Sequence, residues 1–281
     1  MARRPDAVGP VFVFGAGKVG TGLVRALRRV RVAATLRAAR RGLPRSIVAR
    51  IVVLAVRDRD LEPLAVRLRD ARVVPREAVV VHVSGALGPE PLAALRASCG
   101  GVGQMHPMMS FASPRSTPSL ARGNVRVAGD RVAVTRAAAL ARALGMTPRP
   151  LKGLDPALYH AAAGLVANGA AALGALGAEL LERAGVPGSI APRMLGPLLR
   201  SVADNVEMMG FPDALTGPVR RGDAAGIDRH LAVLRAKLPS AVPFYLAAAA
   251  AQLPLARALG DAPSASLDEV EALLQRQRQM S

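Results

Sequence analysis

The chain has 281 residues, a net charge of +18 and a single cysteine, Cys99. Its length favours two domains, and the lone cysteine excludes an intrachain disulfide, so the chain suits a reducing compartment such as the cytoplasm. Hydrophobic residues make up 51% of the chain and aromatic residues only 2%, so the core must consist mainly of Ala, Val and Leu. The first ten residues, MARRPDAVGP, lack the apolar segment of a signal peptide.

The positive charge is concentrated in the first half of the chain. Residues 1–152 contain 27 Lys and Arg against 8 Asp and Glu, whereas residues 153–281 contain 11 against 12. Such an excess of positive charge makes nucleic acid a candidate partner. Almost all the basic residues are arginines, however, as a GC-rich coding sequence would produce, and no zinc-ligand spacing, helix-turn-helix signature or aromatic-studded basic stripe is present. We therefore expect a solvated basic face, with neither nucleic acid nor metal bound.

Short apolar runs alternate with amphipathic stretches through the first half. This alternation predicts βαβ units, and hence a parallel sheet with helices on both faces. The expected strands lie at residues 11–14, 32–36, 51–56 and 78–83, further short runs at 124–127 and 146–151, and helices at 17–29 and 134–144.

The pattern changes at Asp155, where Asp155-Pro156 offers an N-cap and a first-turn proline for one long helix that ends near Gly185. Within it, residues 161–178 are uncharged enough to suggest a membrane span, but Ala and Gly dominate them, so we expect a buried helix. Further helices are expected at 191–209, 223–238 and 243–259, with a last one opened by a capping box at Ser266. The sequence thus predicts an α/β domain over residues 1–152 and an all-α domain over residues 153–281.

The strongest motif is GAGKVG, which follows an apolar strand and opens a helix. Its glycines let the backbone turn tightly and approach a pyrophosphate, and the free N–H groups at the helix N-terminus attract the negative charge. The motif therefore predicts dinucleotide binding. The candidate cofactor-binding residues are Gly15, Ala16, Gly17, Lys18, Val19 and Gly20, joined by Ala55 and Val56 at the end of a later apolar run.

The end of the second expected strand indicates which dinucleotide is bound. NAD-binding versions of this motif usually place an acidic residue there to hold the ribose 2′-OH. No acidic residue occurs between Asp6 and Asp58; instead Arg37 occupies the position, with Arg40 and Arg41 just beyond. Guanidinium groups suit a 2′-phosphate, so NADP is the expected cofactor, although in so arginine-rich a chain any one of these could be a plain surface residue.

Together with GAGKVG, the stretches LAVRD, HVSGAL, HPMMSF, YHAAAGLVAN and ALTGPVRRGD resemble the Rossmann-like proteins whose C-terminal half is a domain of unknown function. That group is similar in architecture to β-hydroxyacid dehydrogenases, pyrroline-carboxylate reductases and the reductases that exchange hydride between NADP and a deazaflavin. The resemblance implies an N-terminal Rossmann dinucleotide-binding domain, an all-α C-terminal domain and a nicotinamide oxidoreductase activity, with no settled substrate.

In β-hydroxyacid dehydrogenases, the first long helix after the Rossmann domain carries a catalytic Lys four residues before an Asn. Asn168 matches that Asn, but Gly164 stands where the Lys would be. His160, one turn earlier, can replace the missing proton donor because an imidazole titrates near neutral pH. The alternative for His160 is a histidine that packs at the domain interface and bonds a carbonyl.

His106, in HPMMSF, is the competing proton donor, because it follows a segment near the expected carboxyl end of the sheet, where open α/β folds bind ligands. Ser84, in HVSG, can contact the nicotinamide or the substrate, or stabilise a turn. Arg220, Arg221 and Asp223 either bind a substrate carboxylate or order their own loop.

The sequence therefore predicts an NADP-dependent oxidoreductase that transfers hydride between nicotinamide and a carbonyl or imine carbon. The small substrate is expected between the two domains, and the Ala/Gly-rich long helix suits close packing in a homodimer. A non-catalytic NADP-binding sensor is the alternative, because of Gly164, and a nucleic-acid-associated protein is a third, weaker one.

Overall fold

The computed structural model describes residues 8–279, so most of the opening stretch MARRPDAVGP lies outside the described residues. The chain divides into two compact units, residues 1–167 and 168–281. The division falls inside a long helix, whereas the boundary predicted from the sequence, between residues 152 and 153, falls just before that helix begins.

The first unit is built around a seven-stranded sheet in the order β2-β1-β3-β4-β5-β6-β7. All neighbouring strands are parallel except β5 and β6, which are antiparallel. The expected parallel sheet is therefore antiparallel at this one pair, because the connection between β5 and β6, residues 108–123, contains no crossover helix. The strands are β1 (Val11–Phe14), β2 (Ala34–Arg37), β3 (Ile51–Leu54), β4 (Val79–His82), β5 (Gly101–Pro107), β6 (Asn124–Gly129) and β7 (Thr147–Arg149).

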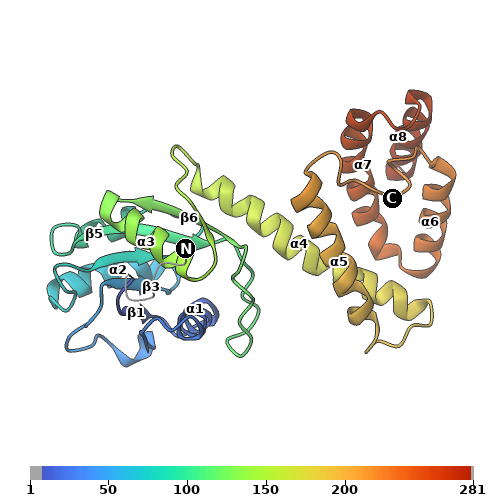
Figure 1. The fold of residues 1–281 in the computed structure, drawn as a ribbon. Coiled ribbons are helices and arrows are strands. Elements are labelled where there is room, and N and C mark those ends of the chain that lie inside the picture. Colours follow the sequence, from blue (N-terminus) through green and yellow to red (C-terminus); the bar gives the residue numbers. More distant parts are fainter. Residues whose placement is uncertain (1–7, 280–281) are drawn as a thin grey trace. The chain divides into compact units, whose positions relative to one another are not determined.

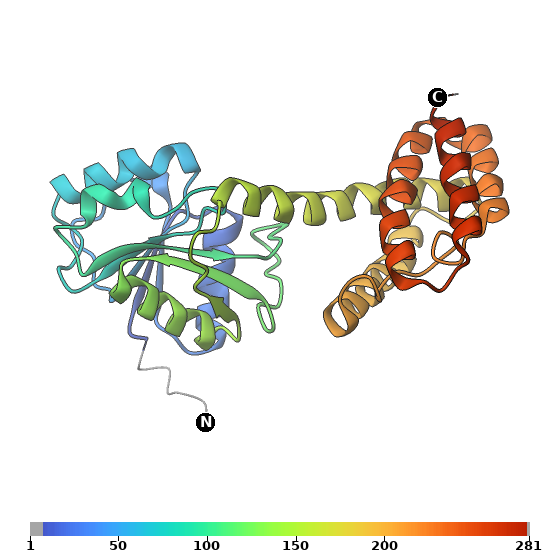
Figure 2. The same cartoon turned by 90° about the horizontal axis from the view of Figure 1, so that it is seen from above.

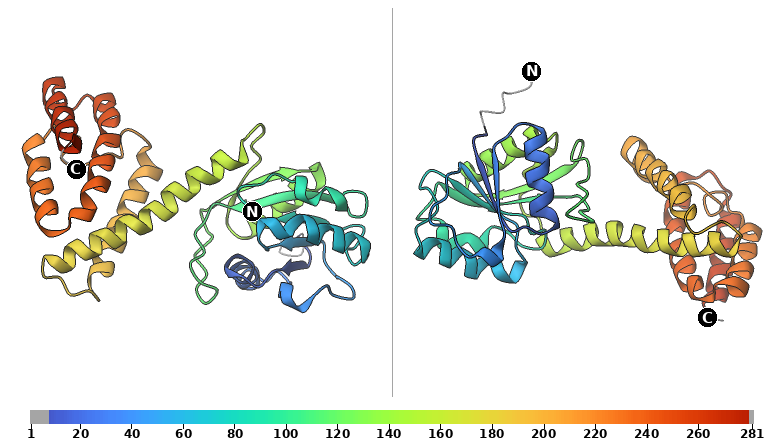
Figure 3. Two further views of the ribbon diagram at one scale, coloured as in Figure 1. Left: turned by 180° about the vertical axis from the view of Figure 1, so that it is seen from behind. Right: turned by 90° about the horizontal axis from the view of Figure 1, so that it is seen from below.

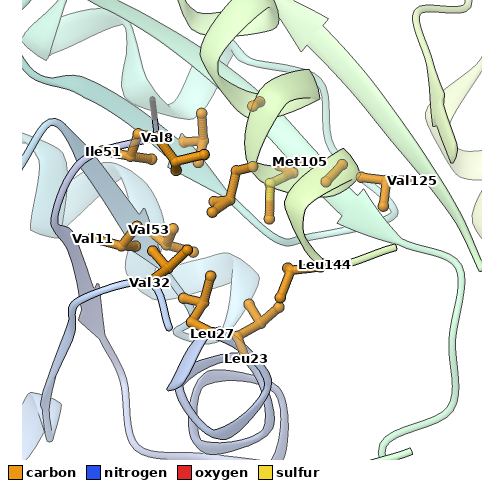
Figure 4. Packing of buried hydrophobic residues seen from close by; sticks show 14 of the residues in the cluster. Val8, Val11, Leu23, Leu27, Val32, Ile51, Val53, Met105, Val125 and Leu144 are labelled. Atoms are coloured by element: carbon orange, nitrogen blue, oxygen red, sulfur yellow. The ribbon is translucent and has the colours of Figure 1, made fainter. Parts of the chain in front are cut away.

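Helices cover both faces of this sheet (Figures 1 and 2). One face packs against α1 (Lys18–Arg29) and α3 (Arg131–Ala143) through a cluster of Val, Leu and Met side chains, part of which Figure 4 shows. The other face packs against α2 (Asp58–Asp70) and the short 3-10 helix η3 (Glu90–Leu95). Because successive side chains of a strand point to opposite faces, strands β1, β3, β4 and β5 contribute to both clusters.

The second unit is all α, as the sequence predicts. Its helices α6 (Ala224–Lys237), α7 (Val242–Leu259) and α8 (Ser264–Gln279) pack around a common apolar cluster (Figure 3). The capping box expected at Ser266 is wrong, because α8 begins two residues earlier, at Ser264.

The long helix α4 (Pro156–Arg183) begins where the sequence predicts. The Asp155 carboxylate accepts hydrogen bonds from the backbone N–H groups of Ala157 and Leu158, at 2.8 and 3.1 Å, which is the expected N-cap. In the second unit, α5 (Ala191–Met209) lies close against α4, because a Cβ added at Gly177 would lie 3.3 Å from the Leu195 side chain.

None of the residues of α4 is buried in the described chain. The expectation of a buried helix is therefore wrong for the single chain. By length and composition alone, α4 and the stretch Pro239–Leu259 are also apolar enough to cross a membrane.

Candidate active site

The glycine motif forms a tight turn between β1 and α1. Gly15 has a φ of +114°, and an added Cβ there would lie 2.2 Å from the carbonyl oxygen of Ala55. A Cβ at Gly20 would lie 1.9 Å from the carbonyl oxygen of Gly15, so both positions require glycine for close backbone approach. Gly17, by contrast, faces open space and is the N-cap of α1 without a side-chain cap. The free N–H groups of the first turn therefore have room for a phosphate.

The arginines at the end of β2 have different roles. The Arg37 Nε donates to the carbonyl of Gly42 at 2.7 Å, and its Nη2 donates to the carbonyls of Arg41 and Leu43 at 2.7 and 3.1 Å. The Arg37 guanidinium, which was predicted to bind the 2′-phosphate, is thus already hydrogen-bonded to the loop that follows it. Arg40 and Arg41 lie in that loop and are exposed, so Arg37 orders the segment that presents them.

Four polar side chains interrupt the sheet face that packs against α2. Apart from these residues, the central strands β1, β3, β4 and β5 are apolar on this face, and every second residue of a strand points to it. Strand pairing brings His82 of β4 beside Gln104 of β5, and His106 of β5 beside Arg126 of β6. These four side chains, His82, Gln104, His106 and Arg126, form what we call the polar row.

Hydrogen bonds link three members of the polar row to the Ser84 segment. The Ser84 N–H donates to His82 Nδ1 at 3.2 Å, and His82 Nε2 lies 2.6 Å from the carbonyl of Gly88, to which it donates. Gln104 Nε2 donates to the Ser84 carbonyl at 2.6 Å, and Gln104 Oε1 accepts from Arg126 at 2.5 Å. The Ser84 backbone is therefore fixed on both sides, while its buried hydroxyl has no partner in the described chain.

His106 and His160 lie together at the end of the polar row. Their ring centroids are 5.8 Å apart, and a hydrogen bond of 3.1 Å joins His106 Nδ1 to the hydroxyl of Tyr159. A Cβ added at Gly85 would lie 2.4 Å from His160 Nδ1 and 2.7 Å from His106 Nε2. The missing side chain at Gly85 thus lets both imidazoles approach the same turn. The structure brings three of the predicted site residues together here: Ser84, His106 and His160.

The two histidines differ in environment. Burial, together with the nearby charges of His160 and Arg126, lowers the pKa of His106 to about 4. His106 is therefore neutral at physiological pH and is poorly suited to donate a proton, whereas His160 is exposed. Burial raises the pKa of the Tyr159 hydroxyl, so Tyr159 remains protonated beside His106.

The other predicted residues have surroundings of their own. Asn168 is the first residue of the second unit and is exposed, and its role stays a prediction. Arg220 bonds Asp261 at 2.7 Å, and the Asp223 carboxylate caps α6 by accepting from Gly226 at 2.8 Å. Of the two roles open for this loop, these contacts favour ordering the loop. Burial raises the pKa of the Cys99 thiol, which disfavours a reactive thiolate.

Tyr159, Gln104 and Arg126 were not among the residues predicted from the sequence. Two signals could have found them. Tyr159 precedes His160 directly and is one of only two tyrosines in the chain. Arg126 lies between valines in the strand NVRVAG, where an alternating pattern permits a charged residue only if its face is solvated or functional. No local signal marks Gln104.

Comparison with known proteins supports this architecture. Residues 124–252 match the model of a domain of unknown function, DUF2520. A search of curated proteins finds no match. The structure is similar to a protein of Bacteroides fragilis assigned as an NADP oxidoreductase, with a TM-score of 0.67 and 21% identity over 87% of this chain and 97% of that one.

Two further similar structures are reductases that contain NADP. One is the pyrroline carboxylate reductase of Plasmodium falciparum with NADP bound, with a TM-score of 0.59 and 11% identity over 96% of this chain and 97% of that one. The other is an imine reductase of Myxococcus stipitatus in complex with NADP+, with a TM-score of 0.52 and 17% identity over 81% and 88% of the two chains. The Rossmann fold expected from the sequence is thereby confirmed.

Proposed function

We propose that the protein is an NADP-dependent oxidoreductase that transfers hydride between nicotinamide and a carbonyl or imine carbon of a small substrate. One observation carries the proposal: a single unit contains both the glycine turn at the end of β1 and a pair of imidazoles beside the ends of β4 and β5. In open α/β sheets, ligands bind at the carboxyl ends of the strands. The NADP-bound reductases with similar folds support the same reading.

The described residues fit NADP at both ends of its adenosine half. The open N-terminus of α1 at Gly17 suits the pyrophosphate, and a Cβ at that position would point into unfilled space. Arg40 and Arg41 suit the 2′-phosphate, and Arg37 positions their loop through its three carbonyl bonds. No carboxylate that would hold a free 2′-OH is present between Asp6 and Asp58.

The residues around Gly85 can serve the proton transfer that accompanies hydride transfer. NADPH, when bound, supplies the hydride. We assign the proton in the reductive direction to His160, because its imidazole is exposed and lies at the same turn as His106. His106, neutral and bonded to Tyr159, orients the substrate oxygen or nitrogen, and the unpartnered Ser84 hydroxyl offers a further hydrogen bond.

A homodimer is proposed as the functional form. The exposed apolar side chains of α5 lie four residues apart, at Met194, Leu198 and Val202, with exposures of 51%, 58% and 48%. On α4, Leu165 and Val166 are 78% and 71% exposed. A second copy of the chain can cover both stripes in water, and the predicted substrate site between domains and the role of Asn168 remain part of this proposal.

The proposal is tested first by titrating the protein with NADPH and NADH at fixed salt. We expect tighter binding of NADPH, and a selective loss of that preference when Arg40 and Arg41 are both replaced by Ala. Equal affinities would contradict the cofactor assignment.

The proton donor is tested with His160→Ala on any carbonyl or imine substrate that the wild type reduces. Turnover should fall by about 10² to 10⁴ with NADPH affinity unchanged, the usual range for a positioned acid. His230→Ala is the matched control, because His230 lies in the other unit, where it bonds Tyr245 at 2.9 Å. Tight NADPH binding without any turnover would favour the sensor instead.

A further inference from the structure

Arg126 is a charged residue inside the sheet. Only 6% of its surface is exposed. Its Nη1 donates to Gln104, its guanidinium carbon lies 5.8 Å from the centroid of the Tyr159 ring, and its buried Nε has no hydrogen-bond partner. A neutral amide and an aromatic face therefore make up its surroundings, and one N–H group is left unsatisfied.

This arrangement leaves a buried positive charge without a counter-ion. Among residues 8–279, no Asp or Glu forms an ion pair with Arg126. Asp58 is near enough to raise the pKa of His106 slightly, but it makes no hydrogen bond to Arg126. Burial of an unpaired charge is costly, and native structures usually pair such a group or use it.

The phosphates of a dinucleotide cannot be the missing counter-ion. The glycine turn follows β1, and β6 lies four strand positions away in the order β1-β3-β4-β5-β6. With neighbouring strands about 4.8 Å apart, the separation is about 19 Å. Tyr159 and, across the strand pair, His106 lie beside Arg126 instead.

We propose that Arg126 recognises a carboxylate of the substrate, and that the substrate is therefore a small acid whose carboxylate lies next to the reducible carbon, as in a 2-oxo or 2-imino acid. The proposal rests on the proposed function for the reducible carbon, but the anion site itself does not depend on it. Arg126 lies opposite His106 in the β5–β6 pair, so a carboxylate at Arg126 places the neighbouring carbon beside the two imidazoles. A guanidinium binds a carboxylate through two parallel hydrogen bonds, which also fixes its orientation.

Anion binding at Arg126 should also change the pKa of His106. The Arg126 charge lowers the pKa of His106, together with burial and the charges of His160 and His82, while Asp58 acts in the opposite direction. A carboxylate that neutralises Arg126 removes one of the depressing charges and adds a negative one. The bound acid should therefore raise the pKa of His106 from its value in the free protein.

The experiment uses oxamate, an inert 2-oxo acid analogue, and oxamide, its uncharged counterpart, on the full-length protein with and without NADPH. Calorimetry should detect oxamate binding and no comparable binding of oxamide. In Arg126→Gln the affinity for oxamate should fall about 30-fold or more, as expected when one partner of a buried charge pair is removed. Arg149→Gln is the matched control, since Arg149 pairs with Arg126 across β6 and β7 but is exposed, and it should leave the affinity unchanged.

A second measurement is the NMR titration of His106, whose pKa should rise with oxamate in the wild type and not with oxamide. Equal binding of the two probes, or oxamate binding that Arg126→Gln does not weaken, would overturn the proposal. If Arg126→Gln does not fold, Arg126→Lys and the two wild-type measurements still decide it. Failure of NADPH to bind while oxamate binding depends on Arg126 would refute the proposed function and leave the anion site standing.

Discussion

His106 couples the stability of the first unit to pH. Its pKa falls from 6.5 in an unfolded chain to about 4 in the fold, mainly because the ring is buried. Between these two values the unfolded chain binds a proton that the folded chain does not bind, so acid favours unfolding. The stabilisation is present above pH 6.5 and is lost as the pH falls toward 4. At 1.36 kcal/mol per pKa unit, the full effect is about 3 kcal/mol, of which about 2 kcal/mol is lost between pH 7 and pH 5.

The substitution His106→Gln removes this titration while it keeps a polar side chain at the position. The chain contains two tyrosines and no tryptophan, so a Tyr245→Phe background leaves Tyr159 to report on the first unit by fluorescence. Urea unfolding at pH 7 and pH 5 then gives the change in free energy of unfolding for each protein. We expect this change to be about 2 kcal/mol larger for the parent than for His106→Gln.

Comparison of two proteins at the same two pH values cancels the titration of the shared carboxylates. His230→Gln serves as a control, because that histidine lies in the other unit and should not alter the pH dependence of the Tyr159 signal. An equal loss of stability in the parent and in His106→Gln would refute the reasoning, because it would mean that His106 titrates alike in the folded and unfolded chains.

Three further predictions follow from backbone and surface geometry. Gly20→Ala places a Cβ 1.9 Å from the carbonyl oxygen of Gly15, so thermal unfolding should show a loss of about 1–3 kcal/mol and a titration should show weaker NADPH binding. Gly85→Ala should displace His160 and lower turnover while NADPH affinity, measured by fluorescence, stays the same. Leu198→Glu should shift the mass measured by light scattering from dimer to monomer without loss of helical circular dichroism; an unchanged mass would exclude α5 from the interface.

The regular elements could be read from the sequence because their local patterns are strong. The run at residues 11–14 and the helix at 191–209 have the predicted bounds, and the Asp155 cap forms as expected. The strand β5 (Gly101–Pro107) has no such pattern, because it contains two glycines, a glutamine and a proline. Glycine and proline are disfavoured in strands, so only its pairing with β4 and β6 makes this segment a strand.

The role of Arg37 could not be read from the sequence either. Its position at the end of the second strand is the one that the cofactor motif predicts, and its charge suits a phosphate. Where its guanidinium points depends on the path of the following loop, and that path brings the Gly42 carbonyl within 2.7 Å. A sequence gives the position of a charge along the chain, whereas the hydrogen-bond partners depend on the tertiary arrangement.

The polar row is predictable only as an exception to a pattern. Along the chain its residues alternate with apolar ones. Leu or Val at Gln104 or Arg126 would bury more apolar area without an unsatisfied N–H group. The unpaired charge of Arg126, whose buried Nε has no partner in the described chain, thus costs stability that a plain sheet would not lose. The row also ends at His106, next to His160. Gly85 lies beside both rings, and its missing side chain leaves room for them. Polar residues that destabilise a sheet and converge on one turn are explained more simply by a ligand than by folding.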